Sequence, residues 1–215
     1  MATLTAMDIS HEHFVRIIAR SQALTSELEL AFGHPPFERQ PRYEASQTAA
    51  SLAFEHGMAL RCLIVDGFGP SAAVVLRSQY EATLRSVWLC YCADEVQVTT
   101  FSTELSNEDA TSDKALPQAA DMLKALEDKA PPAAIASLSN FRKHSWSALN
   151  SFVHAGLHPI KRHRGGLPLP LAAGILRNSN GLSVIAAMQA AVAAGSRELV
   201  SVVLAAQDSF VDCCS

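Results

Sequence analysis

The sequence has few glycines and prolines, ten of each in 215 residues, which excludes collagen-like and low-complexity classes. It also lacks a long apolar run. The most apolar stretch, 182–194, is interrupted by Ser183 and Gln189, whereas a membrane span needs about 20 apolar residues. The N-terminus has no basic region followed by an apolar one, so we expect neither a secretory signal nor a membrane segment. Hydrophobic residues still make up 49% of the chain, which predicts a packed core and excludes global disorder.

Familiar metal and cofactor motifs are absent. The five cysteines form no Cys-x-x-Cys pair and are odd in number, so we expect free thiols in a reducing cytoplasm. Glu-x-x-His does not occur, and His154 and His158 have no neighbouring carboxylate to complete a metal site. The glycine-rich phosphate-binding patterns and the Gly-x-Ser-x-Gly pattern are also missing. We therefore expect neither a metal nor another cofactor.

Acidic residues are missing from one long segment. The formal net charge is −4, yet residues 129–197 contain eight Lys and Arg and no Asp or Glu, whereas residues 1–128 carry 18 acidic and nine basic side chains. This asymmetry indicates either internal neutralisation or attraction of a polyanion. The overall acidity excludes a uniformly basic nucleic-acid coat but not a local basic site. On the second alternative, the expected partner is RNA or another phosphorylated ligand.

Apolar residues recur at helical spacing along most of the chain, and the alternation typical of strands is scarce. We predict an all-α fold, a single bundle of about five to seven helices over residues 1–215. The predicted helices are one capped by Asp8 or Ser10 and ending at Gly33, then 42–66, 71–93, 132–157 and 179–206. Residues 94–130 are predicted to be an acidic, weakly helical insertion with a loop at 107–113, and residues 158–170 a basic loop.

The predicted helix 71–93 carries charge where apolar residues are expected. A helical wheel places Arg77 and Glu81 in the arc of Leu84 and Trp88, opposite a polar side around Gln79, Thr83 and Ser86 that we expect to face solvent. Arg77, Glu81 and Arg85 are spaced four residues apart, so the carboxylate lies one turn from each guanidinium. Two interpretations remain: a structural ion triad, or a site in which Glu81 orients an arginine that meets an anionic ligand.

The predicted helix 132–157 has a polar stripe between two apolar sides. Asn150 and His154 lie one turn apart on this stripe, which also carries Lys143. Histidine titrates near neutral pH, so His154 is a candidate general acid or base; the alternative is an exposed histidine at a helix end. Arg142 falls in an apolar arc and requires a buried partner, for which Glu81 is the candidate.

The basic segment that follows this helix offers further cations. Lys161, Arg162 and Arg164 precede Gly165 and Gly166, a composition that fits a phosphate cradle or a solvated flexible loop. Both interpretations place the basic side chains at the surface.

Two short motifs carry a resemblance to known proteins. The segment 76–88 contains Arg-x-x-Tyr-Glu-x-x-x-Arg, and the segment 149–156 contains Asn-x-x-x-His-x-Gly. Together they resemble a group of bacterial all-helical proteins of unknown function, which in turn is similar to the HEPN superfamily of helical bundles. Many HEPN proteins are metal-independent ribonucleases of toxin–antitoxin and phage-defence systems, and they commonly dimerise around an Arg-x(4–6)-His motif. Here the arginine positions before His154 hold Leu149, Ala148 and Ser147, so that motif is incomplete.

The resemblance implies an RNA- or nucleotide-directed toxin or defence protein that forms a homodimer. In the enzymatic form it implies that His154 moves the proton of a ribose 2′-hydroxyl, Asn150 orients it and Arg77 stabilises the phosphate. The remaining residues are then expected to bind the ligand: Glu81, Arg85, Arg142, Lys143, Lys161, Arg162 and Arg164. The alternative is a non-catalytic binding or interaction module in which Arg77, Glu81 and Arg85 are structural.

Overall fold

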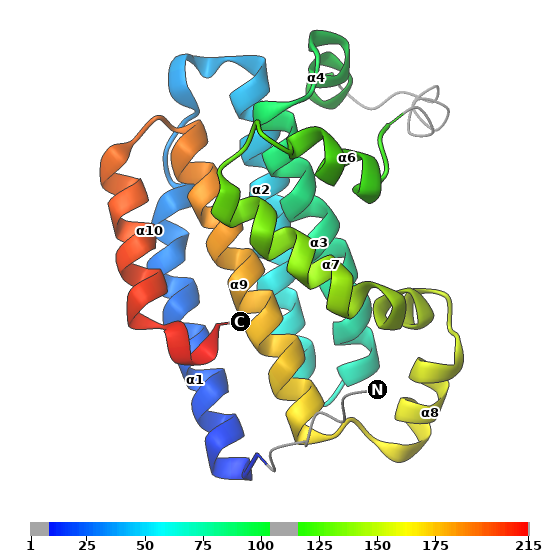
Figure 1. Cartoon of the computed structure of the whole chain (residues 1–215). Coiled ribbons are helices and arrows are strands. Elements are labelled where there is room, and N and C mark those ends of the chain that lie inside the picture. Colours follow the sequence, from blue (N-terminus) through cyan, green and yellow to red (C-terminus); the bar gives the residue numbers. More distant parts are fainter. Residues whose placement is uncertain (1–8, 104–115, 215) are drawn as a thin grey trace.

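The computed structural model describes residues 9–103 and 116–214, and the regular structure in these ranges is entirely helical (Figure 1). The α-helices are α1 (His11–Leu28), α2 (Pro41–Val65), α3 (Gly69–Tyr91), α4 (Glu95–Ser102), α6 (Ala119–Leu126), α7 (Pro132–Val153), α8 (Leu157–Gly165), α9 (Leu169–Ala193) and α10 (Arg197–Ser209). Short 3-10 helices are η1 (Glu29–Phe32), η2 (Phe37–Arg39) and η4 (Val211–Cys213). The predicted all-α fold is confirmed. The nine α-helices of the described ranges exceed the predicted five to seven, and the predicted loop at 107–113 lies outside those ranges.

The centre of the bundle is formed by α2, α3 and α9, which pack against one another (Figure 1). On one side α1 and α10 cover α9, and on the other α7 and α6 pack against α3. Figure 1 shows α8 beside the end of α7, at the opposite end of the bundle from α4. Almost fully buried leucines join these helices, among them Leu24, Leu28, Leu60, Leu76, Leu84, Leu89, Leu138 and Leu176. In the described part of the chain, no helix combines the length and apolar character needed to span a membrane.

The starts of the first three helices follow local signals. Ser10 caps α1, because its hydroxyl accepts a hydrogen bond from the backbone N–H of His13 at 3.1 Å. Pro41 and Pro70 lie in the first turns of α2 and α3, where a backbone N–H has no partner within the helix. The predicted bounds 42–66 and 71–93 therefore agree with the structure to within two residues.

The basic segment 158–170 is largely helical, so its prediction as a loop is wrong. The helix predicted to reach residue 157 ends at Val153, after which Ala155 has a φ of 50° and the Gly156 N–H bonds to the Ser151 carbonyl at 2.7 Å. A new helix, α8, then begins at Leu157. Pro159 is tolerated there because it lies in the first turn, where its missing N–H and fixed φ cost little.

The predicted helix 179–206 is two helices. A break separates α9 from α10, and Gly195 adopts a φ of 67° within it, a left-handed conformation that glycine takes without steric cost. Ser196 then caps α10 by accepting a hydrogen bond from the Leu199 N–H at 3.2 Å. The start of α9 is also ten residues earlier than predicted, because Pro170 again lies in the first turn.

The polar side of α3 is buried, which overturns the expectation that Gln79, Thr83 and Ser86 face solvent. The Gln79 amide donates to the Ser183 hydroxyl at 3.1 Å and accepts from the Ser179 hydroxyl at 2.7 Å. These partners belong to α9, whose small polar residues face α3 across the centre of the bundle. The polar stripe therefore satisfies its hydrogen bonds inside the protein rather than in water.

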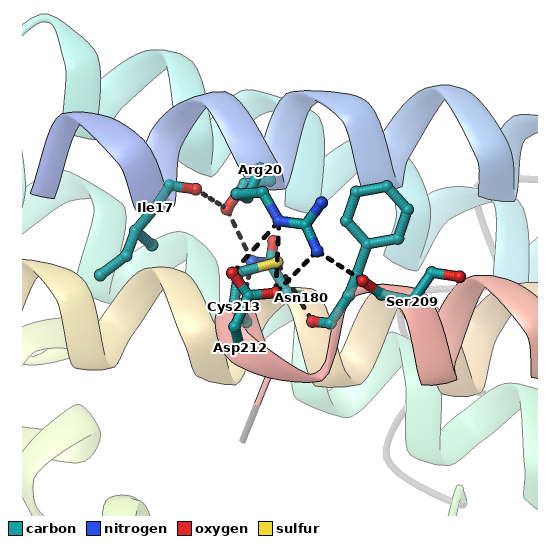
Figure 2. A network of polar contacts seen from close by, with 8 residues as sticks. Ile17, Arg20, Asn180, Ser209, Asp212 and Cys213 are labelled. Carbon is teal, nitrogen blue, oxygen red and sulfur yellow. Dashed lines mark hydrogen bonds and ion pairs between the residues drawn. The ribbon is translucent and has the colours of Figure 1, made fainter. Parts of the chain in front are cut away.

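A second polar network ties the C-terminal segment to α1 and α9 (Figure 2). The Asn180 amide donates to the Ser21 hydroxyl and to the Cys213 carbonyl, both at 2.7 Å. Arg20 pairs with Asp212 at 2.8 Å and donates to the Ser209 carbonyl. The hydrogen bond from Arg20 lowers the pKa of Asp212 below its ordinary value. The last turn of the chain is thus held by both a buried amide and a surface ion pair.

Candidate functional site

Arg77 of α3 and Asn150 of α7 meet where these two helices pack. One terminal nitrogen of the Arg77 guanidinium donates to the Asn150 side-chain oxygen, and the other donates to Glu81 Oε1 at 2.8 Å. Tyr80 fixes the register of the contact, since its ring stacks on Phe141 at a centroid distance of 4.7 Å. The structure thereby brings together three residues that the two sequence motifs contained.

The ring of Trp146 contacts two arginines of the site. The guanidinium carbon of Arg77 lies 3.4 Å from the ring centroid of Trp146, and that of Arg142 lies 5.2 Å from it. Both distances are within the range of a cation–π interaction. Arg142 therefore lies over the tryptophan one turn along its own helix, and no ion pair joins it to Glu81. The predicted Arg142–Glu81 partnership is wrong because Glu81 already bonds Arg77 one turn away on α3.

The site lies at the boundary between core and solvent. The Arg77 side chain is 14% exposed, but that of Glu81 is 42% exposed, so the expected burial of the carboxylate is wrong. Arg142 is half-buried. The Nε atoms of Arg77 and Arg142 are both buried, and neither has a hydrogen-bond partner in the described part of the chain. The site thus holds two guanidinium groups, of which only that of Arg77 pairs with a carboxylate, and the Nε donor of each has no partner among the described residues.

Arg85 belongs to different surroundings. Its guanidinium carbon lies 5.9 Å from the Trp88 ring centroid and 5.5 Å from that of Phe101, which belongs to α4. The predicted triad is therefore resolved into an Arg77–Glu81 ion pair and an arginine placed among aromatic rings.

The other predicted site residues lie at the surface. His154 is the exposed C-cap residue of α7, and among the described residues no hydrogen bond links its imidazole to Arg77 or Asn150. Lys143 is exposed on α7. On α8, Lys161 and Arg164 are exposed and Arg162 is half-buried.

Within the described residues, no carboxylate forms an ion pair with the basic segment, although the charge of Arg177 helps to lower the pKa of Asp212. The ion pairs found in those ranges are Arg16–Glu12, Arg20–Asp212 and Arg77–Glu81, and none of them involves a residue of 129–197. The described residues also contain no cluster of three or more His, Cys, Asp or Glu side chains able to hold a metal ion. All five cysteines are free thiols.

Sequence reasoning did not identify two features. The first is the contact of Trp146 with two arginines. The helical wheel places Trp146 in an apolar arc, but it does not show which neighbouring helix that arc faces. The second is a cavity of about 530 Å³ between α3, α7, α9 and α10. Small residues on α7 and α9, such as Ala133, Ala134 and Gly181, are its only sequence signal.

Residues 50–215 match the model of a family of unknown function, DUF6988. We found no significant match to a curated protein or to a solved structure. The resemblance to the HEPN superfamily therefore rests on the two short motifs alone.

Proposed function

The chain belongs to the family of unknown function DUF6988, and we propose from its site that it binds the phosphate groups of RNA or of a nucleotide at Arg77, Arg142 and Asn150. In the fuller form of the proposal, it is a cytoplasmic, homodimeric, HEPN-like protein of toxin or phage-defence type that cleaves RNA without a metal ion.

The observation that carries the proposal is the pair of buried, unsatisfied guanidinium donors. A buried polar group without a partner costs about 1–3 kcal/mol, and more when it is charged. The Nε–H groups of Arg77 and Arg142 are two such donors around one tryptophan. A phosphate oxygen that displaced the atoms covering these donors would satisfy them with charge-assisted hydrogen bonds, which are stronger than neutral ones, and guanidinium geometry suits phosphate.

The charge distribution supports the same ligand. Glu81 pairs with Arg77 alone, so Arg142 adds a positive charge to the site that no ion pair among the described residues balances. Beyond the site, Lys143, Lys161 and Arg164 lie exposed along α7 and α8. Several exposed cations in addition to the arginines of the site suit a polyanion better than a single small anion.

In the enzymatic form, His154 acts as the general base. It accepts the proton of a ribose 2′-hydroxyl, whose oxygen then bonds to the adjacent phosphorus while the bond from phosphorus to the 5′ oxygen breaks. The 5′ oxygen leaves with a proton from solvent, and Arg77 stabilises the charge on the phosphate. The exposed position of His154, one turn beyond Asn150, is open to a substrate. Catalytic hydrogen bonds are often long or unformed before substrate binds.

One observation favours a second function, that of a non-catalytic binding module. Both terminal nitrogens of Arg77 are already engaged, by Glu81 and Asn150, and its face is covered by Trp146. In this alternative the cluster holds α3 against α7, and the surface around it only recognises a partner.

Binding of a fluorescently labelled single-stranded RNA, followed by anisotropy across a salt series, tests the proposal. Arg142→Gln should weaken binding about tenfold, because it removes one charge-assisted hydrogen bond, and should lower the log–log salt slope by about 0.7. Arg16→Gln is the matched control, since Arg16 is exposed on α1 and outside the site. Salt-independent binding, no binding, or equal losses in both variants would contradict the proposal.

The same RNA tests the enzymatic form in a cleavage assay with EDTA present. His154→Ala should slow cleavage at least about 100-fold, the usual contribution of a general base. His144→Ala, an exposed histidine on the same helix, should leave the rate unchanged. RNA binding without cleavage, or cleavage that survives His154→Ala, would reject the nuclease and leave the binding module.

A further inference from the structure

The cavity between α3, α7, α9 and α10 is lined by none of the residues to which the proposed function assigns a ligand contact. Its floor is apolar and buried, and consists of Val87, Phe141, Leu182 and Val184. Its walls are half-buried or exposed apolar side chains: Ile185, Met188, Val192, Val200 and Leu204. Apolar side chains thus line it from its floor to its mouth.

The way the helices pack explains why this space is open. α7 packs against α3 through the stacked rings of Tyr80 and Phe141, and α10 packs against α9. On the sides of α7 and α9 that face the cavity, Ala133, Ala134 and Gly181 are too small to fill the gap. The result is a half-open cavity of about 530 Å³, within the usual size range of small-molecule sites.

The lining carries polar groups but no strong charge. Ser137, Asn140 and Gln207 are exposed at its rim, where hydroxyl and amide groups can donate and accept hydrogen bonds. Gln189 is buried at the base, and its amide already donates to the Ser46 hydroxyl at 3.2 Å. None of the described lining residues is Asp, Glu, Lys, Arg or His. A charged ligand would therefore lose its hydration here without gaining a counter-charge.

We propose that this cavity binds an uncharged small molecule with a largely apolar body and a hydrogen-bonding group at one end. The apolar body would lie on the floor of Val87, Phe141 and Leu182, and the polar end would meet the amides at the rim. A volume of about 530 Å³ and a lining without charged side chains suit such a molecule.

The test uses the neutral dye N-phenyl-1-naphthylamine, whose fluorescence rises in apolar surroundings, with the full chain. We expect saturable binding of one dye molecule per chain. Ala134→Trp places an indole in the cavity and should raise the Kd at least tenfold, as should Val200→Trp from the opposite wall. Ala136→Trp is the matched control, because Ala136 is exposed on α7 outside the lining, and it should leave the Kd unchanged.

Displacement of the dye identifies the ligand class. Decanol should displace it, whereas decanoate, which has the same chain length and a negative charge, should require at least tenfold higher concentration. The proposal is overturned by non-saturable binding, by equal losses in Ala134→Trp and Ala136→Trp, or by decanoate competing as well as decanol. A dimer that Ala134→Trp dissociates and the dye does not disturb would overturn it in favour of a second copy of the chain. These readouts involve neither RNA nor Arg142, so they succeed or fail independently of the proposed function.

Discussion

Trp146 packs against the guanidinium groups of Arg77 and Arg142 without neutralising their positive charge. A cation–π contact with a partly desolvated guanidinium is worth up to about 2 kcal/mol, and Arg77 lies 3.4 Å from the ring centroid. A second carboxylate in place of the tryptophan would neutralise the guanidinium groups, whereas an aromatic ring leaves their field free to attract an anion. Glu81 supplies the one ion pair of the site, and its 42% exposure means that water screens part of that interaction.

Glu81→Gln tests whether this ion pair serves binding or structure. The glutamine keeps the shape and can still accept from Arg77, while one negative charge is lost from the site. Urea denaturation should show a loss of about 1 kcal/mol or less, the scale of an exposed ion pair. RNA affinity should rise, because the remaining charge is more positive.

The Glu12–Arg16 pair of α1 provides the control for this change. It too is an i, i+4 pair, but both its side chains are largely exposed, so Glu12→Gln should leave both stability and RNA affinity unchanged. A loss of about 3–5 kcal/mol for Glu81→Gln, the cost of breaking a buried pair, would show that the pair is structural.

Residue spacing predicted the contacts of the site that lie within one helix, but not those between helices that are distant in sequence. Arg77 and Glu81 are four residues apart on one helix, so their contact follows from helical geometry alone. The contact of Arg77 with Asn150 joins two helices, and a motif match suggested it without placing it. A helical wheel separates the polar side of a helix from its apolar side. It does not show whether the polar side faces solvent or another helix, and Gln79 bonds to serines of α9.

At the scale of elements, the positions at which helices end determine which helices pack against each other. The break between α9 and α10 lets α10 turn back along α9 (Figure 1). Val200, Leu204 and Gln207 of α10 form one wall of the cavity. Gly195 and Ser196 are the sequence signals for this break. Apolar residues recur at helical spacing on both sides of them, so the two helices read as one. Pro159 lies in the first turn of α8, so a proline shortly after one helix does not show that a loop follows.

Gly195→Ala tests the importance of this break. The substitution should lower the free energy of unfolding by about 1–2 kcal/mol, because an L-residue is strained at a φ of 67°. The added Cβ would also lie 2.8 Å from Cδ2 of the Phe37 ring. Gly174→Ala, inside α9 with open space at its Cβ, should instead stabilise by about 0.5–1 kcal/mol. Equal effects in urea denaturation would show that the break does not require glycine.

At the scale of the whole molecule, the distribution of charge carries the functional argument. The total of −4 conceals a segment with eight basic and no acidic residues, which forms α7, α8 and α9. Composition predicted this asymmetry and the apolar period predicted the all-α class, because both are properties of a single chain read in order. Three features arise only where helices distant in sequence meet: the packing of α7 on α3, the buried Nε donors without a partner, and the cavity.

The buried Nε–H groups of Arg77 and Arg142 are the proposed phosphate-binding donors. Nitrogen-15 NMR observes arginine Nε–H groups directly, and assignment follows from the signals lost in Arg77→Lys and Arg142→Lys. During a titration with inorganic phosphate at constant ionic strength, these two signals should shift together and saturably, while that of exposed Arg16 stays in place. Shifts that do not saturate, or that are equal for Arg16 and Arg142, would contradict this proposal.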